Sequence, residues 1–208
     1  MNSSKTAAEK ASRTDRRRII LAILAGGAVL GVGAAITLAV WNDSEFATGT
    51  FSSGEFDLEG STNGTAFSSD EEAPGKTLAF QLNADALSPN DVVYAPFALQ
   101  LSADSDYSAT VDLSNASDGD IGANLTYDLY AGGEFDAACS AATPPTGTPL
   151  VADRAATEAG VVADILTLSA AATPTNLCFV VTAGADLDQS QSGTITWEFA
   201  GTSVTPLP

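Results

Sequence analysis

The two cysteines of this chain, Cys139 and Cys178, carry its most definite chemistry. Two thiols without histidine and without a CxxC spacing cannot complete a structural zinc site. An even pair of cysteines in a domain outside the cytoplasm is typical of a disulfide, and two free buried thiols are the alternative. We expect the bridge, which would close a loop of about 40 residues and contribute roughly 4 kcal/mol to stability.

The chain contains no histidine, and this excludes most enzyme classes. Ser-His-Asp and Cys-His hydrolases need an imidazole as general base, and HExxH proteases need two imidazoles as zinc ligands. We therefore expect no enzymatic activity and no catalytic residue.

Pairs of acidic residues in predicted turns are the remaining candidates for ligand binding. Ca²⁺ accepts carboxylate oxygens from loops, but no pair here has the twelve-residue spacing of an EF-hand. Such acids are more typical of solvated turns, so we expect no cofactor and keep Ca²⁺ as a weak alternative. The pairs are Asp104 with Asp106, Asp118 with Asp120, and Asp186 with Asp188.

Charge divides the chain into two parts. The 208 residues hold 8 basic and 26 acidic residues, for a formal charge of −18, yet residues 1–39 contain six of the basic ones. From residue 40 onward only Lys76 and Arg154 face 24 acidic residues, which gives that part a charge of −22. Such a charge repels a phosphate backbone, so nucleic acid is not an expected partner.

Residues 1–39 have the features of a signal peptide. A basic region, residues 1–18, ends in three arginines, and the hydrophobic region 19–39 follows without a charge. The small residues Thr37 and Ala39 occupy the −3 and −1 positions of a signal peptidase site, which predicts cleavage before Val40. The uncharged run is also long enough to span a bilayer, so an anchor formed by residues 19–40 is the alternative. On either interpretation the rest of the chain lies outside the cytoplasm.

The elements that position these residues are predicted to be strands. From residue 40 onward the apolar side chains mostly recur with a period of two, and most such segments are bounded by Gly, Pro, Asn and Asp turns. The stretch 134–164 is less regular, and its end fits a helix or a loop before a strand near Ile165. Together with Phe56 and Leu58, the pattern predicts about seven strands, in segments 78–82, 97–101, 107–113, 125–129, 177–181 and 195–199.

This pattern predicts an all-β fold, a single antiparallel β-sandwich of the jelly-roll type. We expect the sandwich to cover residues 59–208, an exposed strand or linker to cover residues 40–58, and a hydrophobic signal or anchor helix to precede them.

The head of the chain carries a specific set of motifs. A Gly-rich hydrophobic stretch with small residues before the cleavage site is followed by Trp41-Asn42-Asp43, Thr50-Phe51, Gly54 and Phe56-Asp57-Leu58. A later turn, Leu87 to Asp91, has the form Leu-x-Pro-Asn-Asp, and its Asn replaces a Gly at little conformational cost. These elements resemble the SipW-dependent exported proteins, the family of TasA and camelysin (CalY).

The resemblance implies a jelly roll and processing by a SipW-type signal peptidase. In TasA-like members it also implies assembly into extracellular fibres of a biofilm-type matrix, in which the freed amino-terminal strand of one subunit completes the sheet of the next. The partners of this chain would then be copies of itself. Camelysin-like proteins have been classed as metallopeptidases, but a chain without histidine makes proteolysis the least favoured function.

The segment after the predicted cleavage site suits such strand addition. Residues 40–54 have little charge and no proline, and strand addition takes its affinity from main-chain hydrogen bonds and its register from anchoring side chains. The alternative is that this segment is simply the first strand and linker of its own domain. The expected donor residues are Trp41, Phe46, Phe51, Phe56 and Leu58.

We therefore expect a secreted or cell-surface structural protein that polymerises by strand addition. The alternative is a monomeric, surface-displayed binding or adhesion module, still anchored by residues 19–40.

Overall fold

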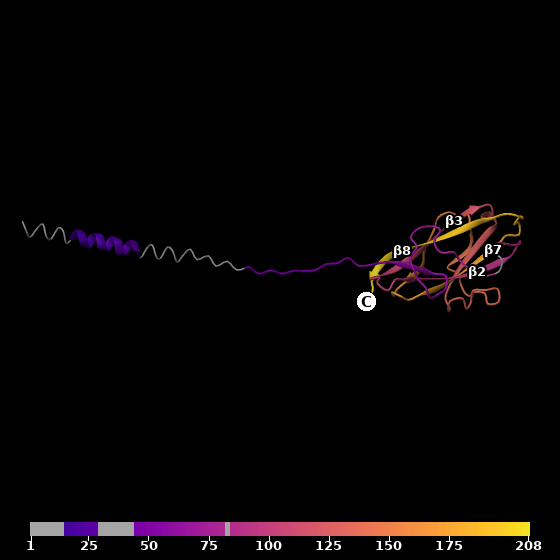
Figure 1. Cartoon of the computed structure of the whole chain (residues 1–208), viewed down its shortest axis with the longest axis horizontal. Coiled ribbons are helices and arrows are strands. Elements are labelled where there is room, and N and C mark those ends of the chain that lie inside the picture. Colours follow the sequence, from indigo (N-terminus) through magenta and orange to yellow (C-terminus); the bar gives the residue numbers. More distant parts are fainter. Residues whose placement is uncertain (1–14, 29–43, 82–83) are drawn as a thin grey trace, which may run out of the picture. The chain divides into compact units, whose positions relative to one another are not determined.

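The computed structural model describes residues 15–28, 44–81 and 84–208. The chain forms two compact units, Met1–Phe51 and Ser52–Pro208 (Figure 1). In the first unit, residues 15–28 form an exposed helix, and residues 44–51 have no regular secondary structure. Among the described residues, no helix combines the length and the apolarity needed to cross a bilayer.

Part of the expected signal segment falls outside the described residues. The predicted cleavage site, with Thr37, Ala39 and Val40, lies there, and so does the first expected donor residue, Trp41. These assignments stay predictions.

The unit Ser52–Pro208 confirms the predicted all-β class. Its strands form two antiparallel sheets, a five-stranded sheet in the order β1-β2-β7-β4-β5 and a three-stranded sheet in the order β6-β3-β8. The elements are β1 (Leu58–Ser61), β2 (Val92–Leu101), β3 (Tyr107–Gly119), the 3₁₀ helix η1 (Ile121–Asn124), β4 (Leu125–Ala131), β5 (Val151–Ala155), β6 (Val161–Leu168), β7 (Thr175–Ala183) and β8 (Gly193–Pro206).

Side chains from both sheets share one hydrophobic core, which makes the fold sandwich-like. In β4 the alternation places Leu125, Tyr127 and Leu129 inside, and β3 contributes Val111 and Leu113 from the opposite sheet. Full burial of a large apolar side chain contributes about 1.5–3 kcal/mol, so this shared core is the main source of cohesion between the sheets.

The structure contains the expected disulfide between Cys139 and Cys178. Leu177 and Phe179 of β7 face the core, so Cys178 between them faces the outer side of the five-stranded sheet. There the disulfide packs with Val180 and the partly buried Tyr94. The bond ties the strandless connection between β4 and β5 to a central strand, and it fits an oxidising, extracellular-type compartment.

Two parts of the strand prediction differ from the structure. Leu78 and Phe80 alternate in burial with their exposed neighbours, but the only pairing of the predicted strand 78–82 in the described residues is a bridge from Gln81 to Tyr94. Conversely, β5 and the first half of β6 lie in the stretch 134–164 that the sequence left ambiguous. Asp153 and Asp164 adopt positive φ there, 45° and 52°, and interrupt the period of two.

A buried arginine joins the two sheets. Arg154 of β5 is 8% exposed and donates from Nε to Asn115 Oδ1 on β3 at 2.8 Å. Its other nitrogens donate to the Gly160 carbonyl at 2.7 Å and to the Glu158 carboxylate at 3.2 Å. Tyr127 of β4 donates its hydroxyl to the same Asn115 oxygen at 2.9 Å. The five-stranded sheet therefore contributes Arg154 and Tyr127 to this polar cluster, and the three-stranded sheet contributes Asn115.

Replacing Arg154 with leucine is expected to lower the free energy of unfolding by about 2–4 kcal/mol, because Asn115 and the Gly160 carbonyl lose a charged donor inside the protein. Urea unfolding followed by circular dichroism measures this. Lys76→Gln removes the same charge from a loop outside the core, where its hydrogen bonds stay within the loop, and is expected to change stability by less than about 1 kcal/mol. Equal effects of the two variants would mean that net charge, and not the cluster, sets the stability.

We expect Tyr127 to make the free energy of unfolding fall at alkaline pH. Burial raises the pKa of its hydroxyl above the ordinary value of 10, while the nearby Arg154 opposes this more weakly. The folded chain thus keeps this proton to higher pH than the unfolded chain does. The free energy of unfolding is therefore unchanged near neutral pH, and it decreases as the pH rises above about 10. Burial also raises the pKa of Tyr130, so more than one tyrosine contributes.

Tyr127→Phe should therefore cost about 1 kcal/mol at pH 7, where the hydrogen bond to Asn115 is lost, and show a shallower decline above pH 10. Thermal unfolding between pH 7 and pH 11 tests both statements. Parallel curves for the two proteins would exclude Tyr127 as a source of the alkaline loss.

Candidate functional site

The three-stranded sheet ends in a long strand with one open edge. β8 spans Gly193–Pro206 and pairs along one side with β3 (Figure 1). Within the described residues, no other strand and no loop backbone hydrogen-bonds to residues 193–205. We call this free side of β8 the open edge. Unpaired N–H and C=O groups in a row are a template for another strand.

Strand alternation identifies the backbone groups that face the open edge. Ser192 directs both its carbonyl and its amide toward the β3 side, where they bond Asp120. The register between β3 and β8 then continues without a shift to Gly201. Because N–H and C=O directions alternate along an antiparallel strand, the backbone groups of Ile195, Trp197 and Phe199 point to the open edge.

Two other edge strands, β5 and β6, are interrupted. In β5, the amide of Asp153 bonds the Asp128 carboxylate and the register to β4 shifts. In β6, the amide of Asp164 bonds the Asp112 carboxylate and the register to β3 shifts. Bulges and charges of this kind protect sheet edges from further pairing. β8, in contrast, has 14 residues of which only Glu198 is charged.

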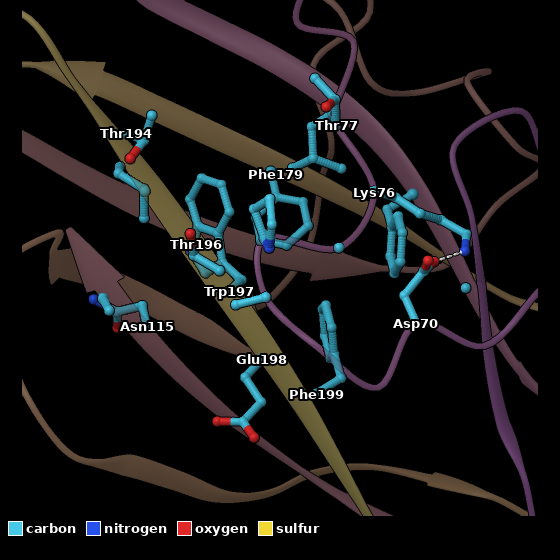
Figure 2. A pocket seen from close by; sticks show the side chains of 18 of the residues that line it. Asp70, Lys76, Thr77, Asn115, Phe179, Thr194, Thr196, Trp197, Glu198 and Phe199 are labelled. Carbon is cyan, nitrogen blue, oxygen red and sulfur yellow. Dashed lines mark hydrogen bonds and ion pairs between the residues drawn. The ribbon is translucent and has the colours of Figure 1, made fainter. Parts of the chain in front are cut away.

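An aromatic pocket of about 780 Å³ lies beside β8. Figure 2 shows Phe179, Trp197 and Phe199 grouped around it, with the ion pair of Lys76 and Asp70 at one side. The Phe179 and Trp197 rings lie with centroids 4.6 Å apart, and Phe199 stacks on Phe97 at 5.5 Å. Both sheets thus contribute aromatic walls, and the pocket suits an apolar side chain.

One polar group in this pocket makes no hydrogen bond of normal geometry. The indole Nε1 of Trp197 is buried and has no hydrogen-bond acceptor among the described residues. The neighbouring Tyr127 hydroxyl donates to Asn115, but its oxygen can still accept, and the Trp197 N–H lies near enough to lower the Tyr127 pKa.

The expected donor residues divide into two groups. Phe46 and Phe51 are 92% and 97% exposed, in a segment without secondary structure. We call residues 44–54 the exposed segment; its only charged residue is Glu45. Phe56 and Leu58, in contrast, pack against the core of their own sandwich, and Leu58 begins β1. Among the expected donor residues that the structure describes, Phe46 and Phe51 are thus the two with exposed side chains.

The weak Ca²⁺ candidates do not converge. Asp106 accepts the Glu55 amide at 2.8 Å, and Asp120 accepts the Ser192 amide at 2.8 Å. Asp104 and Asp118 are exposed, as are Asp186 and Asp188. In the described part of the chain, no three acidic or cysteine side chains gather in a way that could hold a metal ion.

Sequence reasoning did not find the open edge or the pocket. The residues 195–199 were predicted as a strand, but which strand would be left unpaired depends on long-range order that the local pattern does not contain. The low charge of β8 was the one available signal. No protein-family model and no curated protein matches this chain.

Proposed function

We propose that this chain is a secreted structural subunit that polymerises by strand addition. After removal of residues 1–39 by a SipW-type peptidase, the exposed segment of one copy pairs with the open edge of another. The product is an extracellular fibre of copies of this chain, as in the TasA/camelysin family that its head resembles. The role is structural, and the chain is not an enzyme.

The observation that carries this proposal is the match between the two surfaces. A 14-residue strand with an unpaired edge lies beside an aromatic pocket, and the same chain holds two nearly fully exposed phenylalanines in a segment with one charge. Backbone pairing along β8 would provide affinity, and a phenyl ring in the pocket would set the register.

The strand order supports the same reading. A complete eight-stranded jelly roll has sheet orders 1-8-3-6 and 2-7-4-5. This chain has the order β2-β7-β4-β5 in one sheet and β6-β3-β8 in the other, but β1 pairs with β2. We infer a jelly roll whose position beside β8 has no strand among the described residues, and a second copy would supply it.

Comparing two chain starts tests the proposal. A chain that begins at Val40 carries the exposed segment, whereas one that begins at Ser52 keeps Phe56, Leu58 and the whole sandwich. We expect filaments only from the longer chain, by size-exclusion chromatography and negative-stain microscopy. Salt of at least physiological strength is needed, because subunits of charge near −22 repel each other. If both chains stay monomeric, a surface-displayed binding module that uses the aromatic pocket becomes the better account.

A further inference from the structure

A loop segment lies over the aromatic pocket beside the open edge. Residues 68–80, which we call the cover, line the pocket together with β8 from Gly193 to Phe199. A strand added to β8 would lie about 4.7–4.9 Å from it. Figure 2 shows Lys76 and Thr77 of the cover across β8 from Asn115 of β3, so the cover would meet a strand that is added at the open edge.

The backbone of the cover is attached only at its ends. Ser68 exchanges two hydrogen bonds with Gly60 of β1, at 3.0 and 3.2 Å, and Gln81 just after the cover donates to the Tyr94 carbonyl at 2.8 Å. Between them, no backbone group of residues 69–80 bonds the rest of the described domain, and the Gly75 amide bonds Glu72 inside the cover. Segments with few such bonds open at low free-energy cost.

The only lysine of the domain stabilises the shape of the cover. Lys76 donates to the Ser68 carbonyl at 2.9 Å, to the Ser68 hydroxyl at 2.8 Å and to the Asp70 carboxylate (Figure 2). All three acceptors belong to the cover itself. Lys76 therefore closes this loop on itself and does not tie it to the sandwich.

The remaining contacts of the cover are apolar and exchangeable. Leu78 and Phe80 are half-buried against the core, and the Phe80 ring lies 6.5 Å from that of Trp197, centroid to centroid. An incoming phenyl ring from the exposed segment would replace one aromatic contact with another of the same kind. Displacing the cover then costs little net apolar burial.

We propose that the cover is an autoinhibitory device, displaced by the exposed segment of a second copy when that segment pairs with β8. This inference rests on the proposed function and adds its regulation. The cover holds new subunits in a closed state, so that association between subunits is slow until the cover opens.

Binding of a labelled peptide to a chain that cannot donate tests this inference. The chain begins at Ser52, since that compact unit contains its whole core, and the probe is a fluorescein-labelled peptide of residues 44–56. We expect Lys76→Gln to speed association by up to about fivefold, and Phe80→Ala by about tenfold. Lys76→Arg keeps the charge and should behave like the parent chain. Thermal unfolding of each variant verifies that the sandwich is intact.

The outcomes distinguish a failure of this inference from a failure of the proposed function. Faster association in both variants supports a displaceable cover. Unchanged or slower association shows instead that the cover is a fixed wall of the binding site, which overturns the inference and leaves strand addition standing. If neither the parent chain nor the variants bind the peptide, the proposed function itself fails. The same peptide with serine in place of Phe46 and Phe51 is the blank.

Discussion

A chain that begins at Val40 and carries serine in place of both Phe46 and Phe51 is expected to remain monomeric. Both rings are almost fully exposed in the monomer, so their removal costs the folded domain nothing. Burying one phenyl ring at an interface contributes about 1.5–3 kcal/mol. Loss of the ring that enters the pocket should therefore raise the dissociation constant of subunit pairing by about 10- to 100-fold. Sedimentation velocity measures the distribution of species.

The spacing of the two anchors predicts unequal single variants. Positions five apart lie on opposite faces of a regular strand, so only one ring enters the aromatic pocket while the other lies on the outer face. One of Phe46→Ser and Phe51→Ser should then have most of the effect of the double variant. Equal effects would indicate a bulge within the added strand.

Two controls distinguish strand addition from nonspecific hydrophobic association. Val161→Ser removes a 62% exposed apolar side chain from β6 and should leave polymerisation unchanged.

The variant with serine at positions 46 and 51 is the second control. It keeps its open edge, so it can accept a donor strand but cannot provide one. Added to the parent chain in small amounts, it should end growing fibres and shorten them in proportion. Failure to shorten them would argue against a directional strand exchange.

The sequence pattern predicted the strands whose inner faces alternate without interruption. β3, β4 and β7 have unbroken inward positions such as Leu113, Tyr127 and Phe179, and these are core residues in the structure. It did not predict β5, because Asp153 has a positive φ and shifts the phase of the alternation. Burial at Leu78 and Phe80 has the same period as a strand, since a loop that lies over a core also alternates its side chains.

The candidate site consists of the exposed segment and the open edge, and only the first could be predicted from the sequence. The exposed segment could be identified locally, because Phe46 and Phe51 stand in a stretch with almost no charge and no proline. The open edge could not, because it depends on β1 pairing with β2 rather than with β8. That choice is made by contacts between residues far apart in the chain, such as Leu58 opposite Leu101. Periodicity within one segment does not report them.

Removing the disulfide is expected to have the largest effect on stability. The bond closes a loop with a sequence separation of 39, for which the chain-entropy estimate is about 4 kcal/mol. In a domain of this size, Cys139→Ser with Cys178→Ser should lower the melting temperature by about 10 °C. Scanning calorimetry of the double variant measures this, and the parent chain with reductant should move toward the same value. A shift of less than about 2 °C would mean that the loop is already ordered by its other contacts.

The position of the disulfide separates stability from assembly. Cys178 faces the outer side of the five-stranded sheet, where it packs with Val180, whereas the open edge belongs to β8 of the other sheet. At temperatures where the double cysteine variant is still folded, it should therefore polymerise at the rate of the parent chain. Reductant would then lower the temperature at which the fibres melt, but it would not prevent fibre growth at low temperature. A loss of polymerisation by a folded, reduced chain would instead connect the loop between β4 and β5 to the interface, and β8 would not be the sole acceptor.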